Sequence, residues 1–205
     1  KLYSIPPNYA HYCFRVACGL KACTQATHFK EWLGQSKESF HSVVDLQGKP
    51  ITYLDLSVGS LDLGNNSNFD TIAAFNKTIR RLLIEKEVEI GVGGYGEIRP
   101  FYSTDAYEID SNEGAQWRTA HLGIDVWAKT GTPVFAPLDG VVHSFQDNAF
   151  ERDYGPTIIL EHQVSKELTF YTLYGHLSKE SLEELYEGKS VPRGTKIATI
   201  GAPPV

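Results

Sequence analysis

The chain has 205 residues and a formal net charge of −6, and 41% of its residues are hydrophobic while 21% are charged. This composition is typical of a folded protein with one elaborate domain, or with one full core and a second small one. Lys and Arg are scattered, which argues against a nucleic-acid-binding surface, and no apolar run reaches the roughly 18 residues that a membrane-spanning helix needs.

The start of the chain carries no targeting signal, because Lys1 to Ala10 lack the apolar core and cleavage site of a signal peptide. The sequence contains no methionine, so we expect it to belong to something longer. The three cysteines are spaced by five residues, which suits neither a disulfide framework nor a zinc knuckle. We therefore expect the thiols of a reducing compartment, which favours a cytoplasmic location, at Cys13, Cys18 and Cys23.

The first half of the sequence predicts mixed helices and strands. A helix-compatible apolar pattern runs over residues 8–35, and residues 51–58 alternate like a strand. The best-supported helix spans residues 70–87, where apolar residues recur at helical spacing. Asn68 or Asp70 is suited to cap its start.

A glycine-rich run follows at Gly91-Val92-Gly93-Gly94-Tyr95-Gly96. It matches the pattern of dinucleotide-binding loops, but Glu97-Ile98-Arg99-Pro100 continues as extended chain where a helix would have to begin. The lysine, H-R-D and D-F-G motifs of a protein kinase are absent as well. We interpret the run as a glycine turn between two extended segments.

From Phe101 onward, short apolar strands alternate with Gly, Pro, Asp and Asn turns, which is typical of a β-sandwich or barrel. Residues 132–142 and 188–197 repeat a pattern of strand, glycine turn and strand, as two interlocking half-sheets would require. The sequence thus predicts an α+β protein. It divides into a mixed α/β region over residues 1–100 and an antiparallel β domain over residues 101–205.

His121 and Asp125 form a candidate metal-binding pair. Residues separated by an even number on a strand point to the same face, and Gly123 between them leaves room for an ion. The other face would be apolar and part of an ordered core strand, formed by Leu122, Ile124 and Val126. A catalytic zinc usually has three protein ligands and an open position for water, so the pair supplies two of them.

His176 ends an aromatic-rich strand, in the run Tyr174-Gly175-His176-Leu177-Ser178. A histidine there is placed to act as a general base on a water molecule or to stabilise charge on a carbonyl oxygen. A purely structural strand-end histidine fits the position equally well. His143 and His162 lack a carboxylate partner in comparable surroundings, and we interpret them as ordinary strand histidines.

Together these motifs resemble the lysostaphin-type zinc metallopeptidases. The resemblance covers residues 117–201 and rests on the segments Arg118–Asp125, Gly131–Pro137, Asp139–Val142 and Leu173–Ser178. It implies the duplicated hybrid motif, a barrel-sandwich hybrid fold, and Zn²⁺ as cofactor. It assigns two zinc ligands to His121 and Asp125 and a catalytic role to His176.

In that family the third ligand comes from an H-x-H motif, which would follow Val205. The resemblance therefore implies that the 205 residues as they stand cannot close the zinc site. Gly91–Tyr102 followed by Arg118–Asp125 is also similar to a fusion of a kinase-like domain, a peptidase-like domain and a pyridoxal-phosphate-dependent class-III aminotransferase. That similarity implies neighbouring domains in a longer chain and a cytoplasmic location.

The resemblance implies a zinc-dependent endopeptidase that hydrolyses amide bonds in a peptide or a peptidoglycan-like substrate, without a nucleic-acid or membrane partner. Two alternatives stay open. One is a catalytically degenerate scaffold or ligand-binding domain within a multidomain enzyme. The other is a phosphocarrier-type domain that accepts phosphate on His176, in which Asp125 beside His121 has no evident role.

Overall fold

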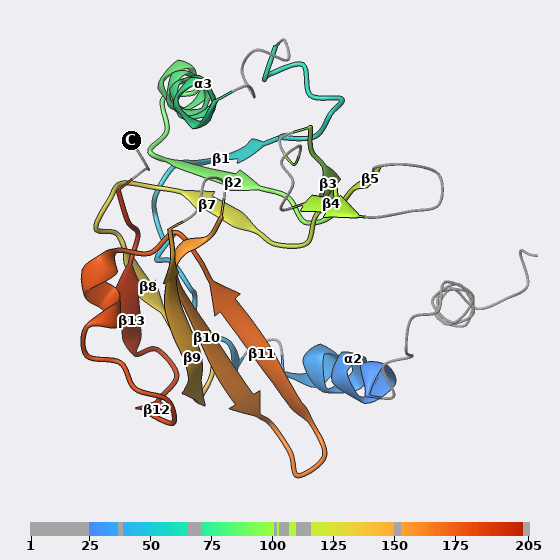
Figure 1. Ribbon diagram of the computed structural model, residues 1–205, viewed down its shortest axis with the longest axis vertical. Coiled ribbons are helices and arrows are strands. Elements are labelled where there is room, and N and C mark those ends of the chain that lie inside the picture. Colours follow the sequence, from blue (N-terminus) through green and yellow to red (C-terminus); the bar gives the residue numbers. More distant parts are fainter. Residues whose placement is uncertain are drawn as a thin grey trace, which may run out of the picture. The chain divides into compact units, whose positions relative to one another are not determined.

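The computed structural model describes residues 25–36, 39–64, 71–100, 102, 107–109, 116–149 and 153–202 (Figure 1). Two compact units are distinguished, Lys1–Phe40 with Gln163–Phe170 and His41–His162 with Tyr171–Val205. Most of the regular structure in the described ranges is β-strand, and two α-helices accompany it. No helix in these ranges combines the length and the apolar composition needed to cross a membrane.

In the smaller unit, helix α2 (Ala26–Gln35) is held by aromatic contacts, since none of its residues is fully buried. Phe29 and Trp32 lie about one turn apart, and their rings approach that of Phe170 with centroids 5.0 and 5.4 Å away. Such pairs contribute about 0.5–1.5 kcal/mol each beyond the area they bury. The helix confirms the end of the pattern predicted over residues 8–35. The earlier part of that pattern and the three cysteines lie outside the described residues.

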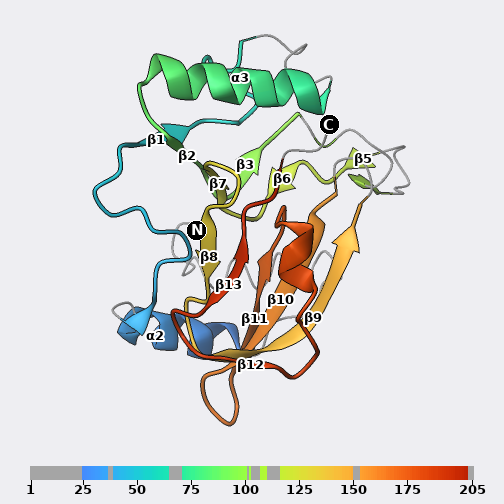
Figure 2. The same cartoon turned by 90° about the vertical axis from the view of Figure 1, so that its left-hand side faces the viewer.

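In the larger unit, helix α3 covers a three-stranded sheet of order β1-β2-β7 (Figure 2). Strand β1 (Ile51–Leu54) pairs in parallel with β2 (Ile90–Gly93), and α3 (Ile72–Glu85) lies in the connection between them, as a parallel pair requires. Strand β7 (Asp125–Trp127) pairs with the other edge of β2 in antiparallel orientation. Segments from both sides of residue 100 therefore share one sheet.

Helix α3 confirms the helix predicted over residues 70–87, but the predicted capping residues were wrong. Thr71 is the N-cap, and its hydroxyl oxygen accepts a hydrogen bond from Ala74 N at 3.1 Å. Asn68 and Asp70 lie outside the described residues. Ile79 and Leu82 on the apolar face of the helix belong to a buried cluster with Leu54 at the end of β1 and with Leu56 and Leu63 beyond it.

The rest of the unit consists of antiparallel sheets and short strand pairs. A four-stranded sheet has the order β11-β10-β9-β12 and is formed by β9 (Gly140–Asn148), β10 (Gly155–Gln163), β11 (Thr169–Tyr174) and β12 (Ser190–Val191). Three separate pairs join β8 (Pro133–Phe135) to β13 (Lys196–Thr199), β3 (Glu97–Ile98) to β6 (Ala120–His121), and β4 (Glu108–Ile109) to β5 (Gln116–Trp117). A 3-10 helix, η5 (Lys179–Leu182), follows β11.

The two copies of the repeated sequence pattern pair with each other. Strand β8 of the first copy pairs with β13 of the second, and β9 of the first copy pairs with β12 of the second. Each of these two strand pairs therefore contains one strand from each copy.

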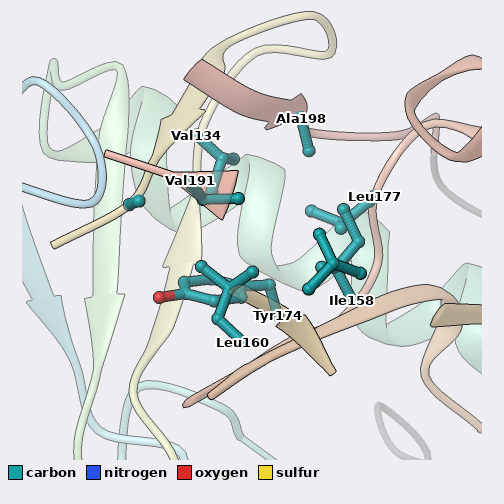
Figure 3. Packing of buried hydrophobic residues seen from close by; sticks show 9 residues of the cluster. Val134, Ile158, Leu160, Tyr174, Leu177, Val191 and Ala198 are labelled. Atoms are coloured by element: carbon teal, nitrogen blue, oxygen red, sulfur yellow. The ribbon is translucent and has the colours of Figure 1, made fainter. Parts of the chain in front are cut away.

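A buried apolar core lies between these strands (Figure 3). Ile158 and Leu160 on β10 have no exposed surface, and burying an aliphatic side chain of this size contributes about 1.5–3 kcal/mol. Tyr174 at the end of β11 and Leu177 beyond it belong to the same core. Core residues thus precede and follow His176 in the chain, and their packing fixes the position of the segment that carries it.

Candidate metal centre

The predicted pair His121 and Asp125 lies at the junction of two short strands. His121 ends β6, Asp125 begins β7, and the His121 Nε2 and Asp125 Oδ1 atoms are 3.5 Å apart. Both side chains are mostly buried, with exposures of 16% and 26%. A Cβ atom at Gly123 would lie 3.1 Å from His121 Nε2, so a larger residue there would crowd the imidazole.

The prediction that this segment is one continuous core strand was wrong. Leu122 and Ile124 are 72% and 60% exposed, and only Val126 is half-buried. The backbone leaves the extended ladder between β6 and β7, so Leu122 and Ile124 extend into solvent instead of forming an apolar face.

The side chains of His121 and Asp125 converge despite this interruption, because the strand register is the same on both sides of it. Gly93 pairs with Asp125 in the β2–β7 ladder, and Glu97 pairs with His121 in the β3–β6 ladder. Four positions separate the two pairs on each segment, so both ladders belong to one antiparallel register. Directly opposed residues of an antiparallel pair project to the same face, which places Glu97, His121 and Asp125 together beside the side-chain-free Gly93.

Arg99 occupies the space that Gly93 leaves. Its Nη1 donates a hydrogen bond to Asp125 Oδ2 at 2.5 Å, while its Nε and Nη2 donate to Glu97 Oε2 at 3.0 and 2.6 Å. The side chains of Arg99 and Glu97 are only 7% exposed. A Cβ atom at Gly93 would lie 3.1 Å from Arg99 Nη2, so the missing side chain is part of this arrangement.

Glu97 is itself held from the other side. Its Oε1 accepts hydrogen bonds from the Tyr53 hydroxyl at 2.9 Å, from Gly94 N at 3.2 Å and from Leu56 N at 3.4 Å. Burial by itself would raise the pKa of Glu97, but the hydrogen bonds from Arg99 and Tyr53 outweigh it and lower the pKa below its usual value. The cluster thus contains two carboxylates and one guanidinium, which leaves one formal negative charge beside His121.

The His121 imidazole has one engaged and one unengaged nitrogen. Nε2 faces Asp125, whereas Nδ1 is buried and has no hydrogen-bond partner in the part of the chain that the structure describes. The ring of Tyr102 stacks against the imidazole with centroids 6.3 Å apart, and burial raises the pKa of Tyr102 to about 12. The imidazole is therefore flanked by a neutral, partly buried aromatic ring.

The third predicted site residue, His176, follows the end of β11 by two positions. Its backbone has φ of 55°, an unusual conformation for a residue with a side chain. Two hydrogen bonds hold it, from His176 N to Tyr154 O at 2.6 Å and from Gly201 N to His176 O at 3.0 Å.

The charges of His121 and Asp125 influence the imidazole of His176. Although the side chain of His176 is exposed, desolvation by the surrounding protein lowers the pKa of its imidazole, and the nearby imidazole of His121 acts in the same direction. The carboxylates of Asp125 and Asp153 act in the opposite direction. The structure therefore brings His121, Asp125 and His176 into one electrostatic environment.

The other two candidate histidines have structural contacts. His162 is fully buried, and its Nδ1 and Nε2 lie within hydrogen-bond distance of Asp139 O at 2.9 Å and Thr172 Oγ1 at 2.8 Å. His143 is exposed on β9, where its ring packs against that of Tyr171. Neither points to metal binding.

His121 and Asp125 fit as two ligands of one zinc ion. At the usual bond lengths of about 2.1 Å, two tetrahedral ligand atoms lie about 3.4 Å apart, close to the observed 3.5 Å. Nitrogen and carboxylate oxygen are also donor atoms that zinc accepts. Within the described ranges, no cluster of three or more His, Cys, Asp or Glu side chains is placed to hold a metal ion. A third ligand would have to come from outside those ranges.

Comparison with known families identifies this part of the chain. Residues 119–204 match the sequence model of peptidase family M23, the lysostaphin-type family. Over these 86 of its 205 residues, the chain is similar to that family. A search of curated proteins and a search of solved structures found no match to the chain.

The M23 segment contains only part of the site. It contributes His121, Asp125 and His176, but Glu97 and Arg99 precede it. In the sequence these two residues served only to reject a nucleotide-binding loop. An acidic and a basic residue two positions apart on an extended segment share one face, and this spacing is the signal in the sequence that could have indicated an ion pair.

Proposed function

We propose that the M23 segment is a zinc-dependent hydrolase domain that cleaves amide bonds in peptides or peptidoglycan-like substrates. The observation that carries the proposal is the convergence of His121 Nε2 and Asp125 Oδ1 within a segment of metallopeptidase ancestry. In this proposal the segment has the duplicated hybrid motif, a barrel-sandwich hybrid, supported by the reciprocal pairing of its two repeats.

Zinc, when bound, supplies Lewis acidity that polarises a carbonyl group and makes a water molecule more acidic. The residues of the chain have distinct tasks. His121 and Asp125 would hold the metal. His176 accepts a proton through its imidazole, and desolvation favours the neutral form that such a base requires. A third protein ligand would come from outside the described residues.

A metal-free scaffold is the second candidate, and one observation favours it. Asp125 already has a cationic partner in Arg99, so its carboxylate is compensated without any metal. A phosphocarrier role for His176 is disfavoured, because the negative charges of Asp125 and Asp153 act on the same imidazole and would repel a phosphate group.

Zinc content separates the two leading candidates. In the intact protein we expect about one zinc ion per chain, measured by elemental analysis after dialysis. We expect its loss in His121→Ala and in Asp125→Ala. His143→Ala is the matched control, because it removes an exposed strand histidine outside the site. Zinc content that is unchanged by His121→Ala would refute this assignment, and zinc-free protein would favour the scaffold.

Hydrolysis is tested with glycine-containing peptides and with peptidoglycan fragments. The expected result is cleavage that depends on zinc and is lost in His176→Ala while zinc content is retained. Cleavage that persists in His176→Ala would remove that residue from the mechanism.

A further inference from the structure

We propose that Arg99, anchored by Glu97, is a positioning residue that prepares Asp125 for metal binding. This inference rests on the proposed function. It assigns a role to a residue that lies 20 positions before the M23 segment begins at residue 119. Residues that precede the family segment would then support the metal ligand Asp125 within that segment.

The proposal rests on the different partners of the two carboxylate oxygens of Asp125. Arg99 Nη1 binds Oδ2, and Oδ1 is left facing His121 Nε2 at 3.5 Å. A carboxylate that is free to rotate would present either oxygen, whereas the guanidinium fixes which one is available. Groups that hydrogen-bond to a metal ligand in this way orient the ligand and tune its affinity.

The guanidinium of Arg99 is itself held in place by Glu97. Glu97 Oε2 accepts two of its N–H groups, and Glu97 Oε1 is tied to β1 by the Tyr53 hydroxyl. Gly93 supplies the space in which the guanidinium lies. A planar guanidinium can bridge two carboxylates at defined angles, which a lysine ammonium cannot reproduce.

Charge compensation also favours a supporting role. Glu97 neutralises the formal charge of Arg99, so the cation next to Asp125 does not present a net positive charge to an approaching metal. The pair stays buried, with 7% exposure on each side chain, and water does not replace either partner readily. Arg99 thus orients Asp125 without cancelling the attraction of the site for a cation.

The test is the zinc dissociation constant of the intact protein, measured by competition with a chromogenic chelator. Removing a group that supports a metal ligand commonly weakens metal binding 10- to 100-fold, and we expect a loss of about this size in Arg99→Gln. Arg99→Lys should fall between wild type and Arg99→Gln. Arg81→Gln is the matched control, since Arg81 forms an exposed pair with Glu85 on α3, and its dissociation constant should equal that of wild type.

A second variant guards against misfolding. Arg99→Gln leaves Glu97 buried without its cation, which is itself destabilising. Glu97→Gln/Arg99→Gln removes both charges together, and it should show the same weakening of zinc binding. Thermal unfolding of the metal-free variants is measured in parallel, so that the dissociation constants are compared among folded proteins.

The outcomes separate the two proposals. Lower stability of the metal-free protein with an unchanged dissociation constant would show that Arg99 is only structural and would overturn the inference. Tighter zinc binding in either Arg99→Gln variant would show that Arg99 competes with the metal, and would also overturn it. If wild type holds no zinc that depends on His121, the proposed function itself fails.

Discussion

Replacement of Gly93 by alanine is a sensitive perturbation of the candidate metal centre. The added Cβ would lie 3.0 Å from Trp127 Cζ3, 3.1 Å from Arg99 Nη2 and 3.2 Å from Leu56 Cδ1, whereas ordinary contacts begin at 3.4 Å. Each neighbour must therefore move by a few tenths of an ångström. Leu56 is fully buried and Trp127 packs against the same core, so two of the three have little freedom to do so.

Overpacking of this kind costs about 1–3 kcal/mol. Alanine also stabilises the folded state by up to about 1 kcal/mol, because it lowers the conformational entropy of the unfolded chain. We expect a net loss of about 1–2 kcal/mol, which lowers Tm by about 2–8 °C for a chain of this length. Because Arg99 must shift, zinc binding should weaken as well.

Thermal unfolding followed by circular dichroism measures the first effect, and chelator competition measures the second. Gly59→Ala is the control, because its Cβ would meet only Ser57 Oγ, at 3.9 Å, and its stability should match or slightly exceed that of wild type. Wild-type stability together with wild-type zinc affinity in Gly93→Ala would refute the packing argument for this glycine.

Three further predictions concern the core and the metal-free state. Leu160→Ala, at a fully buried position, should lower the free energy of unfolding in urea by about 2–5 kcal/mol; a loss below 1 kcal/mol would contradict its place in the core. Burial raises the pKa of Tyr174 to about 12, above the unfolded value of about 10. Its contribution to stability is therefore fully present below pH 10 and lost as the pH rises toward 12. Tyr174→Phe should weaken that alkaline decline in denaturation curves, and an unchanged decline would exclude this cause. Removal of metal with a chelator should leave the far-ultraviolet circular dichroism spectrum unchanged, whereas unfolding would show that metal is needed for the fold.

The sequence was most informative where periodicity follows packing. Helix α3 lies within its predicted range because one apolar face is buried in the cluster around Leu54 and Ile79. The repeat over residues 132–142 and 188–197 also predicted paired strands, since tight glycine turns and apolar segments leave few alternative arrangements. These features depend on local spacing, which a sequence displays directly.

The candidate site was predictable only in part. The spacing of His121 and Asp125 predicted that their side chains share a face, and the structure places them 3.5 Å apart. The same reasoning misplaced Leu122 and Ile124, because period-two alternation does not reveal that both paired segments leave the ladder at the same place. Arg99 was missed because its partners lie 2 and 26 positions away, and the more distant one is a contact set by strand register.

The buried cluster also has a consequence for the order of folding and metal binding. An isolated buried carboxylate is costly, and a metal-binding aspartate would normally leave the apo protein with an uncompensated charge. Here Arg99 compensates Asp125, and Glu97 with Tyr53 fixes Arg99, all through residues of the chain itself. The contacts around Asp125 are thus made by the chain itself through strand pairing, unlike those of structural zinc sites, whose binding energy is also their folding energy. A metal held by His121 and Asp125 would therefore not be needed to compensate the charge of Asp125.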